Sequence, residues 1–470
     1  MRTFLSISLI GWLVLSLSPG ELFAEADTVG ATPMDTTILQ QLKVLDLETA
    51  QRIAIANSPT LTAAAERVNQ ASERVLQAEA AYWPTLDADG SFSRVELSDN
   101  AEDVQREQLQ VVAPGASVDN PEDYYRAGLV ASWTVFDGFR RKFSNALARY
   151  GQDASQAALT EARRLLLSSV ADSYYLAQLA SENIAITEAD EAFNLRQLEE
   201  ARARYRVGTG SLSDTLNFEV QVNAARSARN SFNREYRIAL IGLATLMGVP
   251  DASLPSALEL ARLKAEEERD LTPPDPAEHI DIALLHRPDI QQTESILLQT
   301  GANVGIARSR FYPSLQLAGS LDGERANSGR FEGDDFGNTV GLYLTYRLYS
   351  GGERRARLAE AKYQEKEAEE NLRAVKISVS SDVQEAVANV VTAQRELELQ
   401  RQNAKLVREN RDLVEKEYQA GQASLVRLNE AQRNLTQAQG RLALARVGLR
   451  QALKNLSAST GSILLPFDKP

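Results

Sequence analysis

Two stretches of 67 residues, 140–206 and 353–419, contain no proline and at most an isolated glycine. At a rise of 1.5 Å per residue each would form a helix of roughly 100 Å, whereas an average helix has about 11 to 12 residues. Apolar residues recur at three- and four-residue steps, as at Leu166, Val170 and Tyr174. This period predicts two very long helices that pack sideways against other helices.

The segments around the two stretches repeat in the same order. Each spacing between marker residues is the same in both copies: 25 residues separate Pro59 from Pro84 and Pro288 from Pro313, and 71 separate Asp137 from Gly208 and Ser350 from Gly421. Only the segment from Pro84 to Asp137, and its counterpart from Pro313 to Ser350, differ in length. The segment in the first copy is 16 residues longer. Such a period indicates one supersecondary unit used twice. Shorter helices are expected around each long one, over residues 46–56, 59–82, 211–246, 289–312 and 424–456.

The start of the chain predicts export. Arg2, an apolar run over residues 4–17 and small residues around Ala24 and Ala26 are typical of a secretory signal peptide, residues 1–24, cleaved after one of these alanines. The alternative is an uncleaved anchor helix, for which the apolar run is short, since a span needs about 20 residues. The absence of cysteine excludes disulfides, thiolate metal sites and a lipoprotein anchor on cysteine.

A strand period follows Pro84 and Pro313. Apolar and polar residues alternate in four segments, which predict strands over residues 85–94, 124–137, 313–322 and 336–350. Their lengths, near ten residues, and the aromatic residues at their ends fit a transmembrane β-barrel. The alternative is a soluble hairpin with one face on a core. Four strands cannot close a barrel, because the smallest have about eight, and open edges are not tolerated in lipid. The chain would therefore assemble with copies of itself, and three copies supply twelve strands.

Each long stretch ends in a turn of the form Tyr-x-x-Gly-x-x-Ser-Leu. The residues of the two turns are Tyr205, Gly208, Ser211 and Leu212 in the first copy and Tyr418, Gly421, Ser424 and Leu425 in the second. Glycine suits the left-handed residue that ends a helix, and serine suits the cap of the next one. The chain is therefore expected to reverse direction at both turns.

These turns complete a set of motifs that resembles the TolC-like outer-membrane efflux protein family, the outer membrane factors. The other motifs are the helix starts Asn57-Ser58-Pro59 and Arg287-Pro288-Asp289 and the strand entries Tyr82-Trp83-Pro84 and Phe311-Tyr312-Pro313. The resemblance covers nearly all of the mature chain. It implies a mainly α protein with a small β part and a duplicated helix-hairpin-helix repeat, forming a homotrimer in which a twelve-stranded outer-membrane β-barrel continues into a long periplasmic α-helical barrel.

The resemblance also implies a division of the chain and a function. A first efflux repeat would occupy residues 45–247, an equatorial linker 248–278, a second repeat 279–456 and a short tail 457–470. The trimer would be the outer-membrane exit duct of a tripartite efflux or type I secretion system, with a large periplasmic part. It would passively conduct substrates handed over by an inner-membrane transporter and a periplasmic adaptor. Its further partner would be outer-membrane lipid.

The same resemblance assigns roles to the turns. The eight turn residues above would form the periplasmic tip where the adaptor docks, although Gly208 and Gly421 are also explained by the turn alone. Family members often carry acidic residues just after these turns, at a constriction. Asp214 fits that pattern, whereas the second copy has Arg427 and, one turn later, Glu430. This departure favours an ion pair of Arg427 with Asp214 or Glu430 as part of the gate.

Other classes of function have weaker support. His279 and His286 stand without a thiolate or a third histidine, and no Gly-x-Ser-x-Gly motif occurs, so we expect no metal site, no cofactor and no enzyme. A net charge of −13 argues against nucleic acid as a partner. A periplasmic adaptor or a structural coiled-coil protein of the envelope are the alternatives. An adaptor usually has one helical hairpin, and a coiled-coil protein would lack the four alternating segments.

Overall fold

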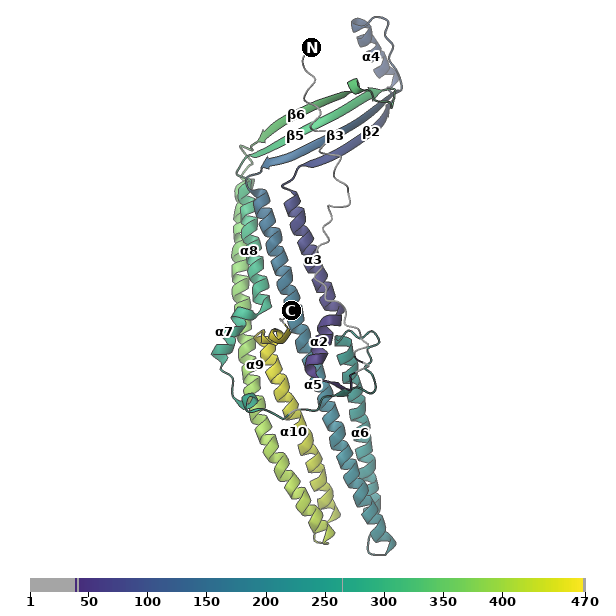
Figure 1. Cartoon of the computed structure of the whole chain (residues 1–470), viewed down its shortest axis with the longest axis vertical. Coiled ribbons are helices and arrows are strands. Elements are labelled where there is room, and N and C mark those ends of the chain that lie inside the picture. Colours follow the sequence, from purple (N-terminus) through teal and green to yellow (C-terminus); the bar gives the residue numbers. More distant parts are fainter. Residues whose placement is uncertain (1–38, 40–41, 264, 468–470) are drawn as a thin grey trace. The chain divides into compact units, whose positions relative to one another are not determined.

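The computed structural model describes residue 39 and residues 42–263 and 265–467, which form two compact units (Figure 1). The smaller unit consists of Gln70–Asp153 and Glu294–Glu370, and the larger one takes the remaining described residues. Each unit therefore draws on both sequence repeats, so the repeats are not separate compact bodies. The predicted signal peptide lies outside the described residues.

The smaller unit contains an antiparallel sheet of four strands in the order β2-β3-β5-β6 (Figure 1). The strands are β2 Thr85–Val95, β3 Glu122–Phe136, β5 Ser314–Ala326 and β6 Phe336–Thr345. Among the described residues no strand pairs with the outer edge of β2 or of β6. The sheet is therefore open at both edges.

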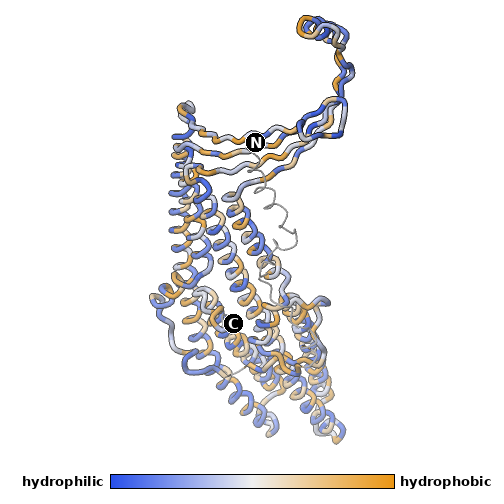
Figure 2. Tube along the Cα trace, turned by 45° about the horizontal axis from the view of Figure 1, so that its top comes forward, coloured by the Kyte–Doolittle hydropathy of each residue, from blue (hydrophilic) through white to orange (hydrophobic). Residues whose placement is uncertain are grey.

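One face of this sheet is apolar and exposed. Hydropathy alternates along the strands (Figure 2), and the register places Trp133 opposite Leu317 and Leu317 opposite Leu342. Directly opposed residues of antiparallel strands project to the same face. Trp133 is 42% exposed and Leu342 is 64% exposed. A large apolar surface of this kind needs a partner or lipid to cover it.

The last strand is shorter than the sequence predicts. Residues 336–350 were expected to be extended, but β6 ends at Thr345. Its final partner is Ser314, the first residue of β5, because Pro313 precedes that strand and has no N–H to donate to the ladder. β2 and β5 run beyond their predicted ends, to Val95 and to Ala326 opposite Tyr124, whereas β3 begins two residues earlier than predicted and ends at Phe136.

The long loop of the first hairpin holds a helix that the sequence analysis missed. Helix α4, Asp99–Val112, lies between β2 and β3, in a segment for which no helix is predicted above. Ser98 occupies the N-cap position, Asp99 and Glu102 lie in the first turn, and Pro114 follows the end. These are ordinary start and stop signals. The helix accounts for most of the longer insert of the first copy.

The long helices are α5, Arg140–Arg206, and α9, Glu353–Gln419, of 67 residues each. Their return helices are α6, Leu212–Leu246, and α10, Leu425–Ser459. Three shorter helices correspond to predicted ones: α2 Leu47–Asn57, α3 Pro59–Ala80 and α8 Pro288–Ser309. Asp46 caps α2 by accepting a hydrogen bond from the Thr49 N–H at 2.8 Å. None of the described helices is long and apolar enough to cross a membrane.

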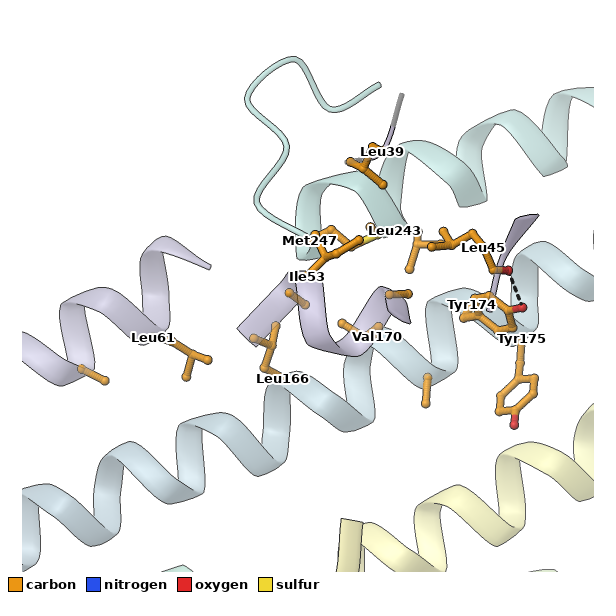
Figure 3. Packing of buried hydrophobic residues seen from close by; sticks show 14 of the residues in the cluster. Leu39, Leu45, Ile53, Leu61, Leu166, Val170, Tyr174, Tyr175, Leu243 and Met247 are labelled. Atoms are coloured by element: carbon orange, nitrogen blue, oxygen red, sulfur yellow. Dashed lines mark hydrogen bonds between the residues drawn. The ribbon is translucent and has the colours of Figure 1, made fainter. Parts of the chain in front are cut away.

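The main core of the larger unit lies where α2 and the start of α3 pack on α5 (Figure 3). Val170 and Tyr174 of α5 are almost fully buried there with Leu243 of α6. The Tyr174 hydroxyl donates to the Leu45 carbonyl oxygen at 3.0 Å. Leu45 belongs to β1, Val44–Leu45, which pairs in parallel with β4, Glu259–Leu260. The linker between the repeats is thus joined to this core.

The linker also contacts the second repeat through buried charge. The Glu266 side chain is only 2% exposed and forms ion pairs with Arg401 of α9 and, at 3.6 Å, with Arg446 of α10. Asp270 pairs with Arg450 of α10 at 2.8 Å. The segment expected to be an equatorial linker, residues 248–278, contains β4, the 3₁₀ helix η1 over Glu268–Leu271 and the start of α7, Pro276–His286.

The end of the chain packs into the larger unit. Residues 457–470 were expected to be a short tail, but α10 continues to Ser459 and the 3₁₀ helix η3 follows at Ser462–Phe467. Ile463 and Leu464 are buried against Leu167 of α5. The apolar pair therefore gives the described part of this segment a fixed place in the core.

Candidate functional site

The two turns predicted to form the tip have the same backbone. At the end of α5 the Gly208 N–H donates to the Tyr205 carbonyl and the Thr209 N–H to the Arg204 carbonyl, both at 3.0 Å. At the end of α9 the Gly421 N–H donates to the Tyr418 carbonyl at 3.0 Å. These bonds use carbonyl groups that a helix end leaves without partners.

The two glycines are needed for conformation and not for space. Gly208 has φ 78° and Gly421 has φ 76°, and a Cβ atom at either would meet no atom within 4 Å. A left-handed residue costs other side chains about 1–2 kcal/mol. The turn itself therefore explains both glycines, which was the alternative to a docking role.

The serines begin the return helices. Ser211 accepts a hydrogen bond from the Ser213 N–H at 3.0 Å, and Ser424 accepts one from the Arg427 N–H at 3.3 Å. Leu212, which follows Ser211, is 49% exposed. Leu425, which follows Ser424, is partly buried, and the next residue, Val426, is 73% exposed. The turns therefore combine a fixed backbone with exposed apolar side chains, a surface suited to binding a protein partner.

Near the turns, the α5–α6 hairpin and the α9–α10 hairpin pack against each other through an apolar cluster. Phe218 of α6 is fully buried with Phe193 of α5, Val414 of α9 and Leu428 of α10. The Phe218 ring lies edge-on to the ring of Tyr418, with their centroids 6.4 Å apart. One chain thus brings its two tips together.

Polar contacts between the hairpins surround this cluster. The Asn429 amide donates to Asn217 Oδ1 at 2.7 Å, which joins α10 to α6. Asp190 Oδ1 of α5 accepts from Gln432 at 2.7 Å and from the Thr436 hydroxyl at 3.1 Å, which joins α5 to α10. The Asp190 carboxylate thus accepts hydrogen bonds from two neutral side chains.

Tyr418 lies among charges from the other hairpin. The Arg204 guanidinium stacks over its ring at 5.6 Å from the centroid. Burial, and next the negative charge of Asp214, raise the pKa of the Tyr418 hydroxyl. Asp214 and Tyr418 are thus near enough to interact, and the phenol is held in its neutral form.

Arg427 pairs within its own hairpin. Its Nη1 lies 3.1 Å from Glu417 Oε2 of α9. Within the described part of one chain it makes no ion pair with Asp214 or Glu430, the two partners expected from the sequence. The Arg427 side chain is 57% exposed, so this pair is weak and open to competition.

Arg204 and Glu417 are tip residues that the sequence analysis missed. They stand 213 residues apart, as do Asp214 and Arg427, so the two tips carry reversed charges at equivalent positions. Arg204 pairs with Glu200 at 3.8 Å. The repeat offset alone could have revealed the reversal, had the charged residues before each glycine been aligned.

Neither histidine belongs to a cluster of metal-ligating side chains among the described residues. Nδ1 of His279 lies 2.8 Å from the Asp275 carbonyl oxygen, and Nδ1 of His286 lies 3.0 Å from the Ile282 carbonyl oxygen. Within residues 42–263 and 265–467 no three His, Cys, Asp or Glu side chains gather as a metal site. The histidines serve local backbone contacts.

Comparison with known proteins identifies relatives along most of the chain. The family model described as outer membrane efflux protein matches residues 51–249 and 279–462. The pyoverdine export outer membrane protein OpmQ of Pseudomonas aeruginosa is 28% identical over 422 residues, covering 88% of this chain and 84% of that protein.

Solved structures share the fold. A membrane protein from Pseudomonas aeruginosa superposes with a TM-score of 0.73 at 23% identity, covering 88% of this chain and 93% of that one. The CmeC outer membrane channel of Campylobacter jejuni superposes with a TM-score of 0.73 at 19% identity, covering 88% and 85%. The two turns described above fall within the regions that the family model matches.

Proposed function

The chain belongs to the outer membrane efflux protein family, and from this premise we propose that it is the outer-membrane exit duct of a tripartite export system. Family members are outer-membrane channel components that work with a periplasmic adaptor and an inner-membrane transporter. The duct conducts passively, and neither catalysis nor a cofactor is part of the proposal. A periplasmic adaptor and an envelope coiled-coil protein are not supported as alternatives.

The open sheet is the observation that carries the proposal. Its four strands have two free edges and one exposed apolar face. Backbone groups at such edges cannot remain unpaired in lipid. Three copies joined edge to edge would give a closed barrel of twelve strands, with the apolar face toward outer-membrane lipid and the other face toward the pore. The proposed assembly is therefore a homotrimer.

We also propose a role for each segment of the chain. Residues 45–247 and 279–456 are the two efflux repeats and residues 248–278 the equatorial linker, after a signal peptide over 1–24 and before a tail over 457–470. The tip residues Tyr205, Gly208, Ser211 and Leu212, with Tyr418, Gly421, Ser424 and Leu425, form the adaptor-docking surface. Exposed apolar groups beside the caps support this role. Asp214, Arg427 and Glu430 line the constriction.

A test of lipid exposure compares two lysine substitutions three residues apart on β6. Leu342 lies on the apolar face, and Thr339, opposite Ser320, lies on the other face. A lysine on a lipid face costs about 2–4 kcal/mol at mid-membrane, whereas pore-side changes are tolerated. We expect Leu342→Lys to reduce the amount of trimer in outer-membrane extracts strongly and Thr339→Lys to assemble as the wild type does.

The readouts are fractionation, mass in mild detergent and conductance in planar bilayers. Trimers in the outer-membrane fraction that conduct ions support the proposal. A monomeric soluble pool in the periplasm, or equal effects of the two lysine substitutions, would reject it.

A further inference from the structure

A cavity of about 420 Å³ opens in the larger unit, away from the tips. It lies where the linker meets α2, α5, α10 and η3, and its walls include Tyr175, Gln178, Arg262, Arg450 and Lys454. Four cationic side chains and three carboxylates line it, although the chain as a whole has a net charge of −13. The cavity is therefore locally more basic than its surroundings.

The three carboxylates are already engaged. Glu48 pairs with Arg52 at 2.6 Å, and Glu267 pairs with Arg269 at 2.9 Å. Asp46 accepts the N-cap hydrogen bond of α2. Glu48 and Glu267 make no ion pair with Arg262, Arg450 or Lys454, as far as residues 42–263 and 265–467 show.

Two of the lining cations have no carboxylate partner. Arg450 is held by Asp270 at 2.8 Å and by the Ala265 carbonyl oxygen at 3.0 Å. In contrast, Lys454 of α10, which is half-buried, and Arg262 of the linker, which is exposed, make no ion pair within the described structure. Burial lowers the pKa of the Lys454 ammonium group, and the nearby charge of Glu48 opposes this shift. A cation that loses water without gaining a partner is destabilising.

Two neutral groups in the same walls also make no hydrogen bond within the described structure, and one of them, Gln178 Oε1, is a fully buried atom. Tyr175 is 7% exposed, lies on the side of α5 toward α10 (Figure 3), and its hydroxyl has no acceptor among the described residues. Gln178 is 7% exposed, and its Oε1 has no donor, while its Nε2 donates to the Ala261 carbonyl oxygen at 2.6 Å. Buried polar groups normally have partners.

We propose that this cavity binds a small oxyanion, a phosphate or a polycarboxylate. Lys454 and Arg262 supply the charge, the Tyr175 hydroxyl donates a hydrogen bond, and Gln178 Oε1 accepts one from a protonated oxygen of the ligand. Each group that the fold leaves without a partner then has one. Because the walls come from the linker and from both repeats, the bound anion would also hold these segments together.

Equilibrium dialysis of the purified full-length protein with radiolabelled phosphate or citrate, at constant ionic strength set by sodium chloride, tests the proposal. We expect saturable binding of at least one of the two anions. Lys454→Met should weaken it at least tenfold and Tyr175→Phe severalfold. Lys405→Met, an exposed α9 lysine outside the cavity, removes the same charge and should bind like the wild type.

Circular dichroism of each variant keeps the result interpretable, since binding is compared only among variants with the wild-type helical signal. The proposal is overturned if neither anion binds saturably to the wild type. It is equally overturned if folded Lys454→Met binds as tightly as the wild type, or if Lys405→Met loses binding to the same degree.

Discussion

Charged contacts near the linker and charged contacts at the tips differ in burial. Near the linker, side-chain exposure is 2% for Glu266 and 7% for Arg287, which pairs with Asp289 and Asp382. At the tips it is 57% for Arg427. Breaking a buried pair costs about 3–5 kcal/mol, whereas an exposed pair contributes about 0–1 kcal/mol. Pairs of arginine with a carboxylate thus hold the helices firmly near the linker, whereas at the tips they leave the helices easy to separate.

The glycines of the two regions differ in the same way. Gly248, φ 70°, follows α6, and a Cβ there would lie 2.3 Å from the Asn57 carbonyl oxygen. The tip glycines have positive φ but open space. Gly248 is therefore required for two reasons, its positive φ and its close contact with the Asn57 backbone. Each tip glycine is required only for its positive φ.

The largest expected effect tests this contrast. Gly248→Ala adds a clash with backbone to the cost of a left-handed alanine, so we expect a loss of about 3 kcal/mol or more. Gly421→Ala is the matched control and should cost about 1 kcal/mol. Urea unfolding followed by circular dichroism measures both. Equal losses would show that the contact to Asn57 is unimportant.

The next effect concerns the buried carboxylate of the linker. Arg401→Met leaves Glu266 with only the more distant Arg446, at 3.6 Å, and should cost about 3 kcal/mol. Arg408→Met changes an exposed arginine two turns further along α9 and should cost almost nothing. If the two variants unfold at the same urea concentration, Glu266 does not anchor the linker.

Alkaline pH should weaken the linker region. Burial raises the pKa of Tyr175 to about 12. Because the unfolded phenol ionises near pH 10, the unfolded state binds fewer protons there, and stability is lost as pH rises from about 10 to about 12. The loss approaches about 1.4 kcal/mol per pH unit for one tyrosine. Tyr175→Phe should reduce the slope of stability against pH in this window. An unchanged slope would contradict the burial of this hydroxyl.

The smallest effect on stability is expected at the tip. Arg427→Ala removes the exposed pair with Glu417 and should cost at most about 1 kcal/mol. It should nevertheless raise channel conductance in planar bilayers if the tip constricts the duct. Glu417→Ala should act in the same direction, and Arg433→Ala, an exposed α10 arginine further from the turn, should not. Unchanged conductance in both tip variants would remove Arg427 from the gate.

Local signals explain what the sequence could predict. A missing proline, an apolar period, a terminal glycine and a capping serine are all written within a few residues of the feature they specify. The long helices and both turns could therefore be predicted, and the pairs Gly208–Gly421 and Ser211–Ser424 gave their register. Gly248 and Gly461 also stand 213 residues apart, so the same offset could have revealed the second glycine pair.

Features that depend on long-range contacts could not be predicted from the sequence. Glu266 and Arg401 are separated by 135 residues, and no local pattern links them. Within one chain Arg427 pairs instead with Glu417, on the adjacent helix of the same hairpin, at 3.1 Å. Its expected ion pairs with Asp214 or Glu430 stay a prediction for the assembled tip. The predicted strand end near residue 350 failed because β5 provides no partner beyond Ser314.

Closure of the sheet by identical copies is tested most directly by cysteine cross-linking, since the chain has no native cysteine. Within one chain β2 and β6 are three strand steps apart, roughly 14 Å, which is too far for a disulfide. Ala88→Cys on β2 is combined in turn with cysteine substitutions at successive residues of β6, such as Val340→Cys. The account predicts covalent dimers and trimers on non-reducing gels for at least one combination. Monomers alone in every combination would contradict it.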